Sequence, residues 1–202
     1  MSDLAVTGPL AHLSFAERTR DLIVSVEERG PICVLDLRLG PKDTAAAAAL
    51  GFDLPTEPRT AVTAGDVTCL WFSIDQWLIV APRDAASGLA EGLRGALEGK
   101  SHALTDVSDM RAVLRISGDA TRMVLAKCCP IDVFAEDFRP GFVRRLSFGE
   151  IAAAIHVVSA EPVTVDLYVF RSYADYALDW LTEAAGPGRA VALFGKTEAP
   201  KI

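Results

Sequence analysis

Two aspartates, Asp106 and Asp109, have the spacing that best suits ligand chemistry. They flank Ser108 in a polar turn that precedes an alternating apolar stretch at 112–116. Two carboxylates fixed on such a turn can bind a ligand amine or the edge of a pterin. The structural alternative is that they accept hydrogen bonds from N–H groups of their own turn, as Asp and Ser side chains commonly do. The residue types favour the structural role, and both aspartates are kept as cofactor-binding candidates.

A second group of side chains lies in the stretch Arg171–Leu181. Ser172 is placed to cap the N-terminus of a helix that begins near Tyr173. Tyr173, Tyr176 and Trp180 recur at helical spacing, which favours a core stripe with polar tips over an aromatic wall for a ligand. Exposed aromatic rings beside Arg171 also suit a protein interface. Arg171, Tyr173 and Tyr176 are therefore the interface candidates.

Motifs of known catalytic chemistry are missing from the sequence. It contains no GxGxxG, no GxxxxGK[ST] and no GxSxG. His12, His102 and His156 are far apart and lack the HxH or HxxxH spacing of a metal site, so we interpret them as surface or structural histidines. The sequence predicts no catalytic residue and no metal site, and it contains no signal for an autonomous dinucleotide or P-loop site.

The four cysteines indicate a reducing compartment. Cys33, Cys69, Cys128 and Cys129 form no CxxC pair, and the first two lie in apolar, strand-like stretches where a free thiol acts as a small hydrophobic side chain. The N-terminus lacks the basic and apolar regions of a signal peptide, and no apolar run is long enough to span a membrane. We therefore expect a cytoplasmic protein without a membrane partner.

Composition and charge exclude further classes. Half of the 202 residues are hydrophobic and 23% are charged, which is typical of a globular chain with a sizeable core. The net charge of −7 repels phosphate backbones, and no Lys/Arg cluster with aromatic residues offsets it. Nucleic acid is not expected as a partner.

Hydrophobic periodicity predicts alternating strands and helices. Gly118 is expected at a corner that needs φ > 0, with Asp119 capping the helix that follows. Gly30-Pro31 favours an antiparallel pairing of the two strands around it. The expected strands are 22–28, 32–39, 67–72, 77–81, 112–116, two around Gly149 within 146–156, and 163–170, and the expected helices pass through 45–49 and cover 84–97, 120–128 and 173–185.

An internal repeat suggests the architecture. The stretches Trp77–Leu97 and Val165–Ala185 share a strand, an Arg-centred corner and an amphipathic helix. We expect an α+β fold of antiparallel sheets with packed helices, built from two related βαβ-type halves. The expected organisation is an irregular leader over 1–20, one domain over 21–195 with halves of about 21–104 and 105–195, and a tail over 196–202.

Four longer motifs give the sequence a family resemblance. They are WFSIDQWLIVAP (71–82), TDVSDMRAVLRISG (105–118), LAKCCPIDV (125–133) and RSYADYALDWL (171–181), and PLAHL (9–13) adds to them. In this order they resemble the gamma subunit of heterotetrameric sarcosine oxidase. The corner at Ser73-Ile74-Asp75 departs from the Gly-Pro-Asp turn that is more frequent in such sequences.

The resemblance implies both a fold and a role. The fold would be related to the folate-binding domain of glycine-cleavage T-proteins. The chain would be an accessory, non-catalytic gamma subunit, with alpha, beta and delta subunits as partners. That complex oxidatively demethylates sarcosine to glycine, with formaldehyde or methylene-tetrahydrofolate and hydrogen peroxide, and holds FAD, FMN, NAD and tetrahydrofolate on other subunits.

Two alternatives stay open at this point. One is a free-standing, folate-dependent methyl- or aminomethyl-transferase, in which Asp106 or Asp109 would meet the substrate amine or the pterin. The other is a gamma-like subunit of a dehydrogenase for another N-methyl amino acid.

Overall fold

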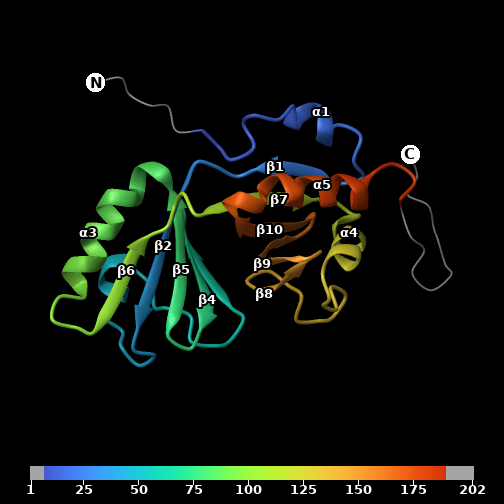
Figure 1. Ribbon diagram of the computed structural model, residues 1–202. Coiled ribbons are helices and arrows are strands. Elements are labelled where there is room, and N and C mark those ends of the chain that lie inside the picture. The colour runs from blue at the N-terminus through green and yellow to red at the C-terminus, as the bar shows by residue number, and fades with distance from the viewer. Residues whose placement is uncertain (1–6, 190–202) are drawn as a thin grey trace, which may run out of the picture.

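Two five-stranded antiparallel sheets form the frame of the protein, as Figure 1 shows for this computed structural model, which describes residues 7–189. The first sheet has the order β3-β4-β5-β2-β6 and the second the order β1-β7-β10-β9-β8. The strands are β1 (Ser25–Glu28), β2 (Ile32–Leu39), β3 (Ala61–Ala64), β4 (Val67–Ser73), β5 (Gln76–Pro82), β6 (His102–Asp106), β7 (Arg111–Ser117), β8 (Val143–Phe148), β9 (Ile151–Ala160) and β10 (Val163–Phe170).

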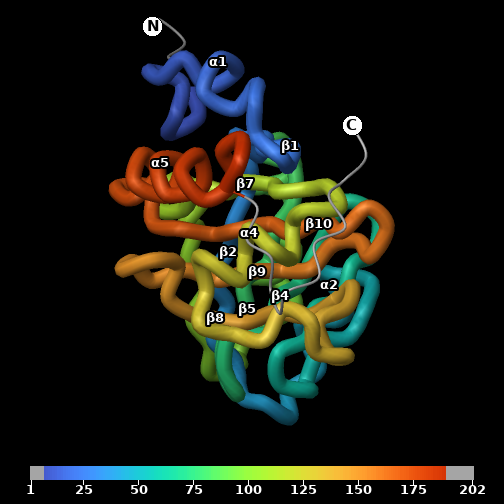
Figure 2. Tube along the Cα trace, turned by 90° about the vertical axis from the view of Figure 1, so that its right-hand side faces the viewer, coloured from blue at the N-terminus to red at the C-terminus, as the bar shows by residue number. Residues whose placement is uncertain are grey.

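Helices cover the outer face of each sheet. They are α1 (Phe15–Thr19), α2 (Ala47–Leu50), α3 (Ala86–Ala96), α4 (Thr121–Cys128) and α5 (Ala174–Ala185), with 3₁₀ turns η1 (Arg83–Ala85) and η2 (Arg171–Tyr173) before α3 and α5. In Figure 2 the leader with α1 lies beside α5. A hydrogen bond between His12 and Asp175 and an ion pair between Arg18 and Asp179 join these segments. Within residues 7–189, no helix is long and apolar enough to cross a membrane.

The two halves repeat one order of elements, which confirms the expected α+β fold. The series β2-α2-β3-β4-β5-η1-α3 is matched by β7-α4-β8-β9-β10-η2-α5, and in each sheet the first strand of the series pairs with the last. The Arg-centred corner of the internal repeat is a 3₁₀ turn, which begins at Arg83 in the first half and at Arg171 in the second. In the first half α3 leads to β6 on the far side of β2, so this βαβ connection skips one strand.

Strand alternation divides the interior into three clusters. Cys33, Leu35 and Leu37 of β2 point towards α2 and α3, whereas Val34 points to the other sheet. In the same way, Ala112, Leu114 and Ile116 of β7 pack with the helices of the second half. The cluster between the sheets consists of Val34, Leu70, Phe72, Leu78, Val113, Val143, Ala154 and Tyr168. The sheets therefore face each other, and each has its own helical cover.

The expected hairpin around Gly30-Pro31 is wrong. β1 pairs with β7 in the second sheet, whereas β2 pairs with β5 and β6 in the first. Val26 packs into the core under α4 and α5, and the core residues of β2 pack under α3, so the chain crosses from one sheet to the other at this link. The stretch β1–β2 runs antiparallel to β6–β7 across both sheets.

Other expectations are corrected in detail. β3 and β6 were not expected, and the leader contains the short helix α1. The alanine stretch forms only the four-residue α2, which begins at Ala47 and ends before Gly51, where the backbone enters the left-handed region at φ 76°. Asp119 does not cap α4, whose N-cap position is Ala120, and Ser172 does not cap α5, because the chain is already helical from Arg171. The apolar piece expected at 191–194 and the tail lie outside the described residues.

Candidate functional site

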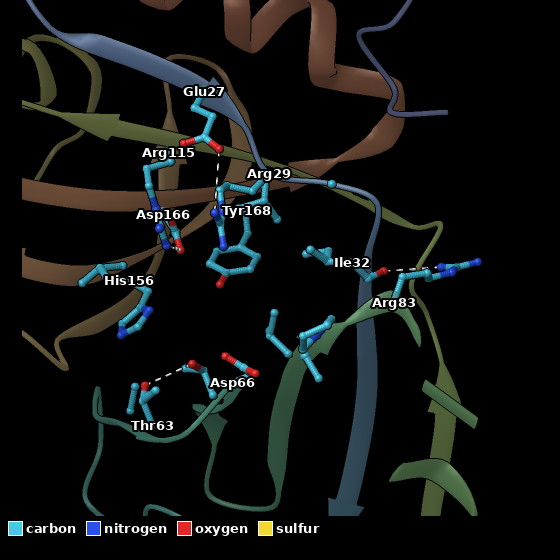
Figure 3. Close-up of a pocket in the computed structure, with 18 of the residues that line it drawn as sticks. Glu27, Arg29, Ile32, Thr63, Asp66, Arg83, Arg115, His156, Asp166 and Tyr168 are labelled. Atoms are coloured by element: carbon cyan, nitrogen blue, oxygen red, sulfur yellow. Dashed lines mark hydrogen bonds and ion pairs between the residues drawn. The ribbon is translucent and has the colours of Figure 1, made fainter. Parts of the chain in front are cut away.

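A cleft of about 810 Å³ opens between the two sheets (Figure 3). The apolar cluster between the sheets closes one end of their contact, and polar side chains line the part where the sheets separate. Strands β1, β7, β9 and β10 of the second sheet supply one wall, and β2, β5 and the β3–β4 hairpin supply the other. A volume of this size is in the range of small-molecule sites.

One polar row crosses the wall that the second sheet provides. Strand register places Glu27 opposite Arg115, Arg115 opposite Asp166, and Asp166 opposite His156. All four side chains line the cleft. Because neighbouring strands hold them in one row on one face, the order along the row is acid, base, acid, imidazole.

Arg115 and Asp166 form the central ion pair of this row. Arg115 Nε and one of its terminal nitrogens each donate to one oxygen of Asp166 at 2.7 Å. The Asp166 side chain is 9% exposed, and the pair raises the pKa of Arg115 above its usual value. At the rim, Arg29 lies 3.8 Å from Glu27. The row is therefore charge-compensated within the sheet.

His156 and Tyr168 are deeply buried polar groups at the floor of the cleft. Burial lowers the pKa of His156 to about 4, although Asp166 opposes the shift, and burial raises the pKa of Tyr168. Both side chains are therefore neutral near pH 7. Neither group is among the fully buried polar atoms of residues 7–189 that lack a partner, so their polar atoms reach the cleft, and in Figure 3 both side chains point into it.

The facing wall is less polar and carries one prominent acid. Thr63 and Thr68 of the β3–β4 hairpin share a 3.0 Å hydrogen bond, and Ile32 and Val80 add apolar surface. Asp66, in the turn of this hairpin, faces Tyr168 and His156 across the cleft in Figure 3.

The two aspartates singled out from the sequence take different places. Asp106 accepts hydrogen bonds from the backbone N–H and the hydroxyl of Ser108, at 2.9 and 2.5 Å, and these hydrogen bonds lower its pKa. The Ser108 hydroxyl in turn accepts the Val34 N–H at 3.0 Å. The Asp106 carboxylate therefore binds within its own turn, as in the structural alternative, and the turn joins the start of β7 to β2 through Ser108 and Val34. Asp109 is exposed and lies 3.3 Å from Arg83; Arg83 lines the cleft, whereas Asp109 does not.

The interface candidates lie on the start of the last helix. Arg171 is exposed, and Tyr173 is 45% exposed. Tyr176 is partly buried against the core, stacks on Trp180 with ring centroids 5.8 Å apart, and accepts the Glu150 N–H at 3.2 Å. Tyr176 is thus largely structural, whereas Tyr173 and Trp180 present aromatic surface two turns apart.

The cysteines and the two other histidines do not line the cleft. All four cysteines are free and buried, and burial raises the pKa of Cys128 and Cys129 to about 12. His12 pairs with Asp175 at the surface, and His102 is exposed. In the part of the chain that the structure describes, no three His, Cys, Asp or Glu side chains gather as metal ligands.

Sequence reasoning missed Arg115, Asp166 and Tyr168 and did not place His156 in a site. A signal was present: Arg115, Asp166 and His156 each interrupt a mostly apolar strand with a titratable side chain. Such residues are buried, and buried charges need partners. Their register across β7, β10 and β9, which brings them together, is not visible in the sequence.

The relatives found by sequence comparison are sarcosine oxidase gamma subunits. The sarcosine oxidase gamma subunit family matches residues 40–187. The sarcosine oxidase subunit gamma of Arthrobacter sp. is 33% identical over 69% of this chain and 68% of its own length. The corresponding subunit of Corynebacterium sp. (strain U-96) is 29% identical over 88% of each chain.

Solved structures agree with this family. A chain of the heterotetrameric sarcosine oxidase from Corynebacterium sp. U-96, in complex with pyrrole 2-carboxylate, matches with a TM-score of 0.83 and 25% identity over 93% of this chain and 98% of that chain. The glycine cleavage aminomethyltransferase T from Bartonella henselae shares the fold, with a TM-score of 0.57 and 14% identity over 87% of this chain and 50% of that chain. The chain belongs to the sarcosine oxidase gamma subunit family.

Proposed function

We propose that this chain is the accessory, non-catalytic gamma subunit of a heterotetrameric sarcosine oxidase. The observation that carries the proposal is the match to a chain of such a heterotetramer over 98% of that chain, at a TM-score of 0.83. A match of this extent aligns a whole subunit rather than a shared domain. The partners would be alpha, beta and delta subunits, and the assembly would oxidatively demethylate sarcosine to glycine in the cytoplasm.

Side-chain chemistry supports the non-catalytic part of the proposal. Burial raises the pKa of Cys69, Cys128 and Cys129, so these thiols stay protonated and are poor nucleophiles. Asp106 is occupied by its own turn, and Asp166 by Arg115. These groups serve the fold.

The cofactors of the assembly would lie on its other subunits. The charged groups of the cleft are largely paired within this chain, and the rim adds the carboxylate of Asp66, which disfavours a pyrophosphate. The cleft therefore does not fit a dinucleotide. We assign FAD, FMN, NAD and tetrahydrofolate to the partner subunits.

The surface of α5 is the proposed contact with a partner. Tyr173 and Trp180 are among the most exposed large hydrophobic side chains of residues 7–189, and Arg171 is next to Tyr173. Aromatic residues and arginine are enriched at protein interfaces and often dominate their energetics. The opposite flank of α5 is covered by the leader, through the hydrogen bond of Asp175 and the ion pair of Asp179.

Co-expression with and without this chain tests the proposal. With the chain, the other subunits should assemble and oxidise sarcosine. Asp109→Asn, which changes one exposed carboxylate, should leave kcat and KM within about twofold. Full activity of the assembly without the chain would contradict an accessory role, and a loss of kcat in Asp109→Asn by orders of magnitude would contradict the non-catalytic assignment.

The two alternatives make different predictions in the same system. A gamma-like subunit of another dehydrogenase would support oxidation of a different N-methyl amino acid, which substrate comparison on the assembly detects. A free-standing aminomethyltransferase would act without partners. The likeness to the aminomethyltransferase covers half of that protein and shows a common fold, so it does not favour this alternative.

A further inference from the structure

We propose that the cleft between the sheets binds a small zwitterionic molecule of the amino-acid class. Its carboxylate would face Arg115, His156 and Tyr168, and its ammonium group would face Asp66. This inference goes beyond the accessory role and does not depend on it, because all of these side chains belong to this chain.

Unused hydrogen-bonding capacity on the floor of the cleft is the first argument. Tyr168 is 2% exposed and His156 is 6% exposed, but neither is among the fully buried side-chain atoms without a partner, which in residues 7–189 are Arg111 Nε and Thr121 Oγ1. The small exposed part of both side chains therefore includes their polar atoms, which reach the open space of the cleft. Figure 3 shows both side chains directed into the cleft, where a ligand can take the place of water on these atoms.

The donors on this floor suit a carboxylate. Arg115 has five N–H donors, and Asp166 takes two of them. The neutral imidazole of His156 provides one N–H, and the Tyr168 hydroxyl provides another donor. Three different side chains thus offer donors to the same space.

Charge on the rim selects against a simple anion. Arg115 is compensated by Asp166, and Arg29 by Glu27, so the floor carries no net positive charge. Asp66 forms no ion pair with any residue in 7–189 and adds a negative charge on the facing wall. An anion alone would meet Asp66, and a cation alone would leave the donors of the floor unused. A zwitterion satisfies both walls.

The position of the cleft supports a built site rather than a packing defect. Register fixes the polar row on four adjacent strands, β1, β7, β10 and β9, and the facing wall comes from the other sheet. Apolar residues at these positions would let the sheets close on each other, as they do at the neighbouring cluster of Val34, Leu70 and Tyr168.

The test is a titration of the full chain with labelled histidine, followed by nuclear magnetic resonance of the His156 ring. The probes are glycine, sarcosine, acetate and methylammonium. We expect saturable shifts for glycine and sarcosine, and about tenfold weaker binding for acetate and for methylammonium, because each lacks one of the two charges. Equal binding of acetate or of methylammonium, no saturable shift, or tighter binding of tetrahydrofolate than of either zwitterion would overturn the proposal.

Matched variants connect the shifts to the cleft. Tyr168→Phe removes one hydroxyl and should weaken glycine binding about three- to tenfold. Tyr173→Phe makes the same change on the exposed face of η2 and should leave it unaltered. If Tyr168→Phe does not fold, Asp66→Asn in the exposed hairpin turn replaces it and should remove the preference for glycine over acetate. Unchanged glycine binding in Tyr168→Phe, or an unchanged preference in Asp66→Asn, would contradict the assignment.

Discussion

At the scale of single residues, His156 couples the cleft to pH. Its pKa is about 4 in the folded chain, mainly through burial, against about 6.5 for an unperturbed histidine. Between these values the unfolded chain binds a proton that the folded chain excludes, so the free energy of unfolding decreases as the pH falls from 6.5 towards 4.

We predict that His156→Gln removes this part of the pH dependence. Between about pH 7 and pH 4.5 the wild-type chain should lose about 2–3 kcal/mol more stability than the variant, in urea unfolding curves. His102→Gln, an exposed histidine, is the control and should follow the wild type. Parallel curves for wild type and His156→Gln would show that His156 titrates normally in the folded chain.

The ion pair beside His156 makes a second prediction. Asp166→Ala leaves the Arg115 guanidinium partly buried without its carboxylate and should cost about 2–4 kcal/mol of stability. The double variant Arg115→Met with Asp166→Leu removes both charges and should cost less than Asp166→Ala alone. Chemical denaturation of the variants checks the order. A double variant less stable than the single one would mean that the pair itself is strongly stabilising.

At the scale of elements, the hairpin turns allow a comparison of two glycines. Gly149, between β8 and β9, has φ 54°, and an added Cβ would lie 2.8 Å from the Tyr176 hydroxyl and 3.2 Å from the Trp180 ring. Gly65, between β3 and β4, has φ 57° with open space around it. The backbone strain is therefore the same, and only the contact with α5 differs.

We expect Gly65→Ala to cost about 1 kcal/mol, from the left-handed backbone alone. Gly149→Ala should cost about 1–2 kcal/mol more, because the Tyr176–Trp180 stack must move. Thermal unfolding of both variants measures the difference. Equal losses would show that α5 adjusts freely against the β8–β9 hairpin.

The sequence predicts much of this level of structure, for identifiable reasons. The strand–corner–helix repeat depends on residues that are close in sequence, so the corners at Arg83 and Arg171 could be predicted correctly. Strand pairing is not local: β1 leaves β2 for the other sheet, and β6 lies beside β2 rather than in a turn. For the same reason the row from Arg115 to His156 could not be assembled from sequence, because it exists only through the register of three strands.

At the scale of the whole molecule, the exposed face of α5 makes a prediction about assembly. Tyr173→Ala should weaken association with the partner subunits by about 1–3 kcal/mol, because exposed aromatic side chains at interfaces often dominate the binding energy. Ile74→Ala, at the exposed β4–β5 turn, is the matched control and should bind normally. Affinity measurements on co-expressed subunits compare the two. Weaker binding of Ile74→Ala alone would move the interface to the other half of the molecule.

The accessory-subunit assignment is tested most directly by native purification of the tagged chain from its own cells, followed by mass spectrometry and absorption spectra of what elutes with it. We expect co-elution with larger, flavin-bearing subunits in a yellow complex that oxidises sarcosine and releases hydrogen peroxide. A colourless single chain that binds tetrahydrofolate and elutes without partners would contradict it.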